Sequence, residues 1–338
     1  MTEAEVIRID ARVRAIGRMR CRATTTSGRP CRNYALEGYD YCAVHKRSRA
    51  SNTSPAKPSI PESMGASDVW EWVRRRLSGD YEVDDFGLDE ELVRDVFGPL
   101  IKPIYERWFR VRTIGIDRIP GSGSALLVAN HSGTIPLDSV MMTYAVANEH
   151  SARRIVRNVG ADLVYKLPFV GPLARKAGTV VAHEEDALEL LRRGELVGVF
   201  PEGFKGVGKG WRERYRLQRF GRGGFIELAL RARVPIIPVA IVGAEEAYPM
   251  IGNIKPLASL FGLPYFPVTP TWPLLGPLGV VPLPSRWIIE FGDPVAMDDY
   301  PEDAAEDPML VFDLTDEIRD RIQQMLFKNL NARGGAFL

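Results

Sequence analysis

Residues 126–138 read LLVANHSGTIPLD, an apolar run that ends abruptly at a polar Asn-His pair followed by Gly and Pro. Such a run is typical of a buried strand, and Gly and Pro mark the turn that ends it. Pro136 is tolerated at the first position of a helix and Asp138 is favoured in its first turn, so a helix is predicted to begin here. The pattern places His131 at the carboxyl end of a strand, which is the edge of an open α/β sheet where ligands bind.

His131 and Asp138 are the first candidate catalytic residues. A histidine at a strand end with a carboxylate close behind it suits proton transfer to or from a bound substrate. The alternative is structural, because a polar His can end a strand while Asp138 stabilises the helix dipole. These residues alone leave both interpretations open.

A second apolar run, residues 196–200, breaks into Pro201, Glu202 and Gly203. The ordered pair of motifs, Asn-His…Asp followed by Phe-Pro-Glu-Gly, resembles the glycerolipid acyltransferase superfamily, whose members acylate lysophosphatidate and related glycerides. The resemblance spans residues 90–330 and is nearest to the monoacylglycerol- and diacylglycerol-acyltransferase-like branch, because of residues 213–224 and a later Pro-rich apolar stretch.

The resemblance implies transfer of a fatty acyl group from acyl-CoA or acyl carrier protein to a hydroxyl of a glycerolipid or related lipid alcohol. It assigns His131 as the general base, Asp138 as its partner, and Glu202 and Gly203 to acceptor binding. The family places four residues between His and Asp, whereas this chain has six, and Gly133 suggests a bulged turn that returns Asp138 to His131. Lysophosphatidate acylation in phospholipid biosynthesis is the alternative activity within the family.

A run of cations follows the second motif. Lys205, Lys209 and Arg212 are the candidates for substrate binding, and further arginines extend to Arg222 with one acid among them. Such a strip suits the phosphates of coenzyme A or of lipid head groups. Lys205 stands where the family usually has Arg, and a solvated basic loop is the alternative.

The acceptor is predicted from residues 178–184. In the lysophosphatidate-specific branch, the corresponding motif ends in an Arg that holds the substrate phosphate, whereas here it ends in Glu184. A carboxylate repels a phosphate dianion, so a neutral glyceride or other lipid alcohol is expected to be preferred. Arg175 and Lys176 would reverse this preference if they folded back into the site.

Two other classes of protein fit parts of the sequence. Residues 203–209 match the spacing of a nucleotide-binding P-loop, but Gly210 stands where Ser or Thr must bind magnesium. A non-catalytic adaptor that binds lipid or nucleic acid is the second alternative. The presence of both His131 and Glu202 argues against it, and nucleic acid is not expected as a partner.

All three cysteines lie near the N-terminus, with a histidine beside them. Cys21, Cys31, Cys42 and His45 match a closed, tetrahedral structural zinc site, and the pattern resembles small treble Cys-His modules of bacterial proteins. Unrelated thiols are the alternative. The predicted domains are a zinc module at 1–48, a Ser- and Pro-rich linker at 49–66, and an acyltransferase domain at 67–338.

The rest of the chain predicts an α/β fold. Strands such as 234–242 alternate with helices such as 184–193, 224–232 and 310–330. This alternation is typical of a mostly parallel sheet flanked by helices. With 45% hydrophobic residues the chain can also bury a sizeable core.

The balance of charge and apolarity predicts the location of the protein. The formal net charge is +1, and neither a signal peptide nor a clean transmembrane helix is apparent. Residues 256–285 carry no charge but contain eight prolines, which suits a membrane-surface or acyl-chain-lining loop, with a buried or partner-facing loop as the alternative. The expected location is cytoplasmic, with peripheral attachment to the cytoplasmic face of the membrane.

Overall fold

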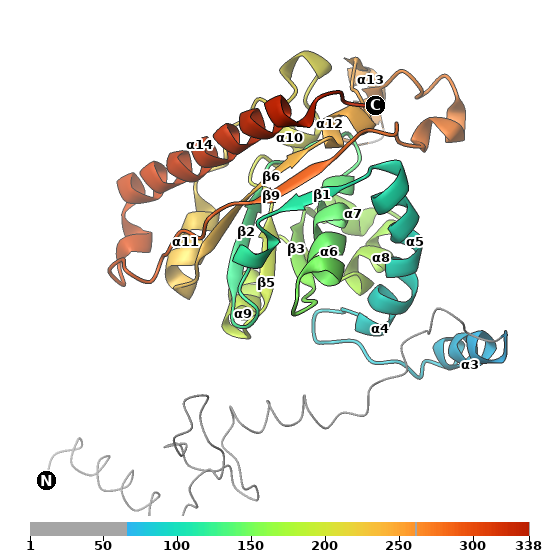
Figure 1. The fold of residues 1–338 in the computed structure, drawn as a ribbon, viewed down its shortest axis with the longest axis horizontal. Helices are drawn as coiled ribbons and strands as arrows, with labels where there is room; N and C mark the ends of the chain where they lie inside the picture. Colours follow the sequence, from blue (N-terminus) through green and yellow to red (C-terminus); the bar gives the residue numbers. More distant parts are fainter. Residues whose placement is uncertain (1–65, 261, 338) are drawn as a thin grey trace, which may run out of the picture. The chain divides into compact units, whose positions relative to one another are not determined.

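The computed structural model describes residues 66–260 and 262–337, which contain a seven-stranded sheet with helices on both faces (Figure 1). The strands of this sheet are β1 (Arg112–Ile114), β2 (Ala125–Ala129), β3 (Val156–Gly160), β4 (Val180–Val181), β5 (Leu196–Val199), β6 (Ile236–Val242) and β9 (Ile288–Phe291). A separate two-stranded antiparallel sheet pairs β7 (Gly252–Asn253) with β8 (Pro267–Val268). The predicted α/β class with a mostly parallel sheet is confirmed.

Helices connect most of the strands. They are α3 (Ala66–Leu77), α4 (Glu90–Leu92), α5 (Gly98–Pro103), α6 (Leu137–Glu149), α7 (Asp162–Lys166), α8 (Val170–Lys176), α9 (Glu184–Arg192), α10 (Phe204–Val207), α11 (Gly224–Ala232), α12 (Ala244–Ala247), α13 (Lys255–Leu260) and α14 (Pro308–Arg333). Helix α14 starts earlier than the predicted 310–330 because the Asp307 carboxylate accepts hydrogen bonds from the backbone N–H groups of Met309 and Leu310.

The strand order places three carboxyl ends together. The order is β1-β9-β6-β2-β5-β3-β4, and β2 runs parallel to both of its neighbours, β5 and β6. Only β9 and β1, at one side, run in the opposite direction. Leu127 aligns with Gly198 on β5 and with Ile237 on β6, so these strands end at one edge of the sheet. Helices α10, α12 and α13 gather at that edge, at the top of Figure 1.

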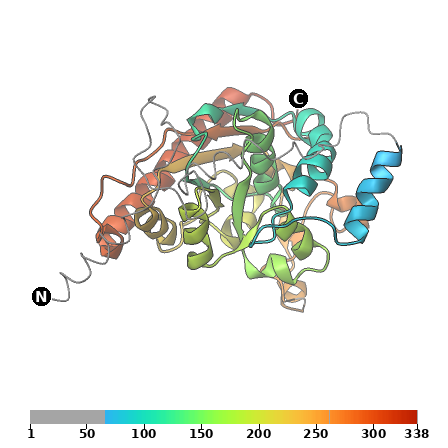
Figure 2. The same ribbon diagram turned by 90° about the horizontal axis from the view of Figure 1, so that it is seen from below.

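Both faces of the sheet are covered, and the side chains of β2 alternate between them. Leu126 and Val128 pack with α9, α11 and α14, whereas Leu127 and Ala129 pack with α6 and the helical segment before β1. Figure 1 shows α14 at the upper left of the sheet and α5 at its right, and Figure 2 shows the same elements from below. Because both faces are buried, these strands are continuous apolar runs in the sequence.

The predicted amphipathic segment 92–109 is helical but irregular. Two π-helical turns, Val93–Phe97 and Ile104–Trp108, alternate with α4 and α5. Pro99 and Pro103 have no N–H to donate to a preceding carbonyl, and the changes of helix type occur next to them. The predicted bend at the prolines therefore takes the form of π-turns.

The predicted N-terminal features lie outside the described residues. This applies to Cys21, Cys31, Cys42 and His45, so the zinc site stays a prediction, as does the linker before α3. Across the part of the chain that the structure describes, no helix is both long and apolar enough to cross a membrane.

Candidate active site

The ends of β2, β5 and β6 supply the polar groups of the candidate active site. Asn130 and His131 follow β2, Glu202 follows β5, and Glu245 follows β6. The Asn130 side chain donates to the backbone carbonyl of Ile241 (3.0 Å) and accepts from its N–H (2.7 Å), which ties the end of β2 to β6. These two hydrogen bonds fix Asn130, and therefore the position from which the His131 turn begins.

His131 and Asp138 lie in contact. The His131 Nδ1 atom is 2.8 Å from Asp138 Oδ2, although six residues separate them in the sequence. The turn needs Gly133, whose φ is +78° and where a Cβ atom would lie 2.5 Å from the Ala244 carbonyl oxygen. The expected bulged turn is therefore present, and it returns Asp138 to the imidazole.

Asp138 is fully buried in the first turn of α6, where its carboxylate is held by three donors. The backbone N–H groups of Ser132 and Ser139 each donate to it at 2.8 Å, in addition to the imidazole. An ionised carboxylate can only accept, so His131 Nδ1 carries the hydrogen. No described residue bonds to His131 Nε2, which keeps its lone pair available, and 15% of this side chain is exposed. The ring packs against Phe200, with centroids 4.6 Å apart.

Glu202 supports the backbone of the His131 turn. Its Oε1 accepts the His131 N–H (2.9 Å), and its Oε2 accepts the Gln218 N–H (2.6 Å) and lies 3.2 Å from the Lys209 ammonium. Both oxygens of this buried carboxylate thus have protein donors. Its predicted contact with the acceptor stays a prediction, and its observed contacts hold the catalytic candidate in place.

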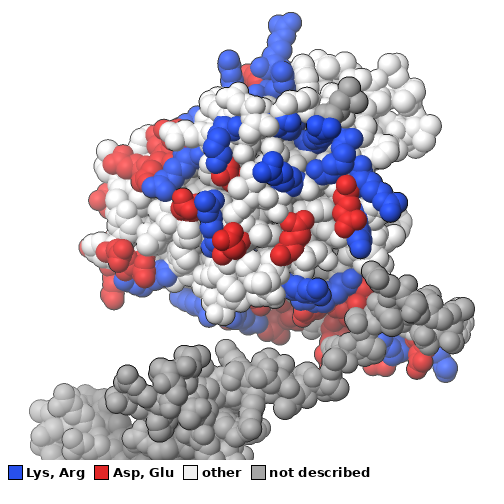
Figure 3. Space-filling model, viewed as in Figure 1, with Lys and Arg blue, Asp and Glu red and all other residues white. Residues whose placement is uncertain are grey.

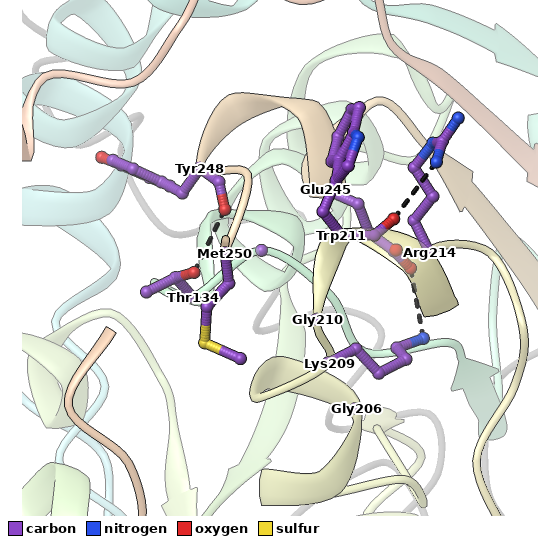
Figure 4. A pocket seen from close by; sticks show the side chains of 10 residues that line it. Thr134, Gly206, Lys209, Gly210, Trp211, Arg214, Glu245, Tyr248 and Met250 are labelled. Carbon is purple, nitrogen blue, oxygen red and sulfur yellow. Dashed lines mark hydrogen bonds and ion pairs between the residues drawn. The ribbon is translucent and has the colours of Figure 1, made fainter. Parts of the chain in front are cut away.

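Lys209 bridges two buried carboxylates. Its Nζ lies 3.2 Å from Glu202 and 3.1 Å from Glu245, and Figure 4 shows the side chain reaching Glu245 beside a small cavity of about 10 Å³. Burial alone would lower the pKa of Lys209, but the two carboxylates outweigh it and raise that pKa. An ammonium held in this way is poorly placed for a phosphate. The geometry therefore favours neither the P-loop interpretation nor direct substrate binding by Lys209.

The remaining predicted residues fall into two groups. Gly203 has a φ of +53° and precedes α10, where it turns the chain after Glu202. Lys205 is exposed and lines an open cleft of about 510 Å³. The cleft residues are Pro201, Glu202, Phe204, Lys205, Arg219, Gly221 and Arg222. Arg212 is exposed and does not line this cleft.

Glu245 was not predicted, although it has a signal in the sequence. It follows a strand that was recognised, and the ends of parallel strands meet at one edge. Its Oε2 accepts the Tyr215 N–H (2.9 Å), and burial raises its pKa to about 7 despite the opposing effect of Lys209.

We expect Glu245 to make stability depend on pH. Its pKa is raised on folding, so the folded protein binds more protons than the unfolded chain between about pH 4.5 and 7. Its contribution is fully present below that window and is lost as pH rises, by up to ~3 kcal/mol in the free energy of unfolding. Glu245→Gln should flatten this slope in urea unfolding measured from pH 4.5 to 8. Glu213→Gln, at an exposed position, should keep it, and an unchanged slope in Glu245→Gln would contradict the assignment.

A second buried network, also missed from the sequence, joins the active-site edge to α14. The Tyr215 hydroxyl donates to Glu246 and accepts the Gly243 N–H (2.9 Å). Arg333 of α14 pairs with the same Glu246 carboxylate at 2.8 Å. The end of β6 is therefore held by a helix that begins far later in the chain.

Among the described residues, no group of His, Cys, Asp and Glu side chains could hold a metal ion. The site consists of an imidazole paired with the buried Asp138, two further buried carboxylates joined by Lys209, and a basic cleft. It can accept a proton at His131 Nε2, and the basic cleft that follows β5 can bind an anion.

Comparisons with known proteins identify the family of the chain. A family model described as Acyltransferase matches residues 110–242, which include both motifs. An uncharacterized protein of Mycobacterium tuberculosis is 48% identical over 295 residues, covering 87% of this chain and 82% of that protein. The human DGAT1/2-independent enzyme synthesizing storage lipids is 26% identical over 227 residues, covering 67% of this chain and 64% of that enzyme.

A search of solved structures finds the 1-acyl-sn-glycerophosphate (LPA) acyltransferase PlsC from Thermotoga maritima. It is 17% identical, with a TM-score of 0.45, and the match covers 70% of this chain and 81% of that one. The family expected from the two motifs is confirmed by the family model, which covers both of them. The chain belongs to the acyltransferase family.

Proposed function

We propose that the protein transfers a fatty acyl group from acyl-CoA, or from acyl carrier protein, to a hydroxyl of a glycerolipid or related lipid alcohol. The observation that carries the proposal is the contact between His131 and the buried Asp138 at the carboxyl edge of the sheet. An alcohol is a weak nucleophile at neutral pH, so it needs a base within hydrogen-bond reach.

The proposed reaction has two proton transfers. As the acceptor oxygen bonds to the thioester carbonyl carbon, His131 Nε2 takes the hydroxyl proton and the carbonyl oxygen becomes an oxyanion. When the carbonyl re-forms, the carbon–sulfur bond breaks and the leaving thiolate takes the proton from Nε2. Asp138 stabilises the imidazolium between these steps and keeps the Nδ1–H oriented, because it accepts that hydrogen throughout.

The basic cleft next to Glu202 supports binding of a phosphorylated substrate. Lys205, Arg219 and Arg222 line it, and guanidinium groups bind phosphate through two parallel hydrogen bonds. The phosphates of coenzyme A and a lipid phosphate share this chemistry. The cleft opens beside the turn that follows β5, on the same edge as His131.

A neutral acceptor is the first proposal, and the name of the human relative, an enzyme synthesizing storage lipids, supports it. Repulsion of a substrate phosphate by Glu184 contributes less to this preference than the sequence predicts. Its carboxylate pairs with Arg231 at 2.5 Å, so part of its charge is neutralised. The three cations of the cleft favour lysophosphatidate as the second candidate.

A competition assay separates the two candidates. We expect purified protein, offered one acyl-CoA with monoacylglycerol, diacylglycerol, a long-chain alcohol and lysophosphatidate, to acylate a neutral alcohol several-fold faster than lysophosphatidate. The products would be separated and quantified by mass spectrometry. A preference for lysophosphatidate that is lost in Lys205→Gln would reject the neutral acceptor and assign the cleft to the acceptor phosphate.

A further inference from the structure

The uncharged stretch of the sequence forms a lobe with exposed leucines. We define the apolar lobe as residues 251–260 and 262–285, which contain β7, α13, β8 and a 3₁₀ turn and carry one charged side chain, Lys255, before the uncharged stretch. The side chains of Leu260, Leu274 and Leu278 are 75%, 85% and 70% exposed, and Leu275, Val280 and Val281 are at least half exposed. The surfaces of soluble proteins carry single, scattered apolar residues. Six exposed aliphatic residues in one short segment instead indicate a surface that contacts a partner.

The lobe is anchored to the active-site edge. The Tyr265 hydroxyl donates to the Thr134 carbonyl (2.8 Å), within the turn that joins His131 to Asp138. The Tyr248 hydroxyl donates to the Val280 carbonyl (2.6 Å), and Tyr248 lines the small cavity beside Lys209. Whatever the lobe contacts is therefore brought close to the catalytic candidate.

A cationic strip lies beside the lobe. Arg212, Arg214 and Arg216 are exposed, and the Trp211 N–H before them donates to the carbonyl of Met250, where the lobe begins (2.8 Å). Figure 3 shows Lys and Arg side chains gathered at the upper part of the molecule, next to an uncharged projection. The strip adds positive charge at the edge of an apolar surface, and Asp and Glu are absent from the lobe itself.

We propose that the apolar lobe and the cationic strip form a docking surface for an anionic lipid bilayer. Leucines enter the boundary between head groups and acyl chains, while arginines at the rim attract anionic head groups. An apolar surface without acidic side chains, with cations along one side, is complementary to an anionic bilayer. The proposal rests on the proposed function in one respect, since docking would bring lipid acceptors to His131.

The test is sedimentation of the full chain with vesicles, without any acyl donor. Wild-type protein should bind vesicles of phosphatidylcholine with phosphatidylglycerol more tightly than vesicles of phosphatidylcholine alone. Each Arg adds roughly a fivefold preference at low salt. The variant Leu274→Ser/Leu278→Ser should bind the anionic vesicles roughly a hundredfold more weakly or worse, because two leucine side chains no longer leave water on binding.

The matched control is Met309→Ser/Phe312→Ser, which removes two exposed apolar residues at the start of α14 and should bind as wild type does. Equal binding by the lobe variant, or no binding by wild type, would overturn the proposal. A change from dimer to monomer in the lobe variant, without any vesicle binding by wild type, would assign the lobe to self-association instead. Acyl transfer to short-chain, monomeric substrates should be unchanged in the lobe variant. Vesicle binding by a protein that transfers no acyl group would reject only the proposed function.

Discussion

Replacing His131 by Ala is expected to lower kcat/KM for thioester-dependent acyl transfer by about 10²–10⁴-fold, which is the typical contribution of a positioned general base. The acceptor hydroxyl would then lose its proton to water rather than to Nε2. Release of coenzyme A and formation of the acylated lipid would both be followed. Folding would be checked by circular dichroism. We expect the fold to be kept, because the hydrogen bond from residue 131 to Glu202 is made by the backbone N–H and not by the imidazole.

Gln324→Ala is the control. Gln324 is exposed on α14, outside both motifs and the basic cleft. We expect this variant to turn over at the wild-type rate. Undiminished turnover in a folded His131→Ala protein would remove His131 from the mechanism. A loss of similar size in both variants would indicate an indirect effect on structure.

Replacing Lys209 by Met is expected to cost about 3–5 kcal/mol of the free energy of unfolding, because it leaves buried carboxylates without their cation. The Lys209 side chain is 3% exposed, and it contacts both Glu202 and Glu245. The loss should be larger at pH 8 than at pH 5.5. The pKa of Glu245 is already about 7, so at low pH this carboxyl is protonated and needs no partner.

Lys255→Met is the control that tests whether removing a lysine elsewhere also lowers the free energy of unfolding. Lys255 is exposed at the first position of α13, and surface substitutions of this kind usually change stability by less than about 0.5 kcal/mol. Urea unfolding at both pH values would be measured for the two variants. If Lys209→Met unfolds with the same free energy as Lys255→Met, the buried ion pairs contribute nothing measurable.

Both stability predictions concern the same group of residues. Glu202 connects this group to the chemistry, because its carboxylate accepts from the backbone of His131 and also contacts Lys209. A change at Lys209 is therefore expected to reach the His131 turn through one intermediate side chain. The loss of stability in Lys209→Met can be separated from the loss of catalysis in His131→Ala, because the second substitution removes only the imidazole.

The sequence by itself determined the fold class and the first catalytic candidates. Strands buried on both faces are continuous apolar runs, so β2, β5 and β6 are visible in the chain without a partner. Helix α11 occupies the predicted residues 224–232, because its amphipathic pattern and its flanking residues are local signals. His131, Asp138 and Glu202 each follow a recognisable strand or helix boundary, so their approximate place also depended on local signals.

Only the tertiary structure decided what these side chains contact. Glu202 meets the His131 backbone and Lys209 meets Glu245 because β5, β2 and β6 lie side by side, an order that no local pattern contains. The roles of Lys209 and Arg212 could not be told apart in the sequence, since both are cations in one strip. Burial distinguishes them, because a buried ammonium requires carboxylate partners whereas an exposed guanidinium stays available to a ligand or a surface.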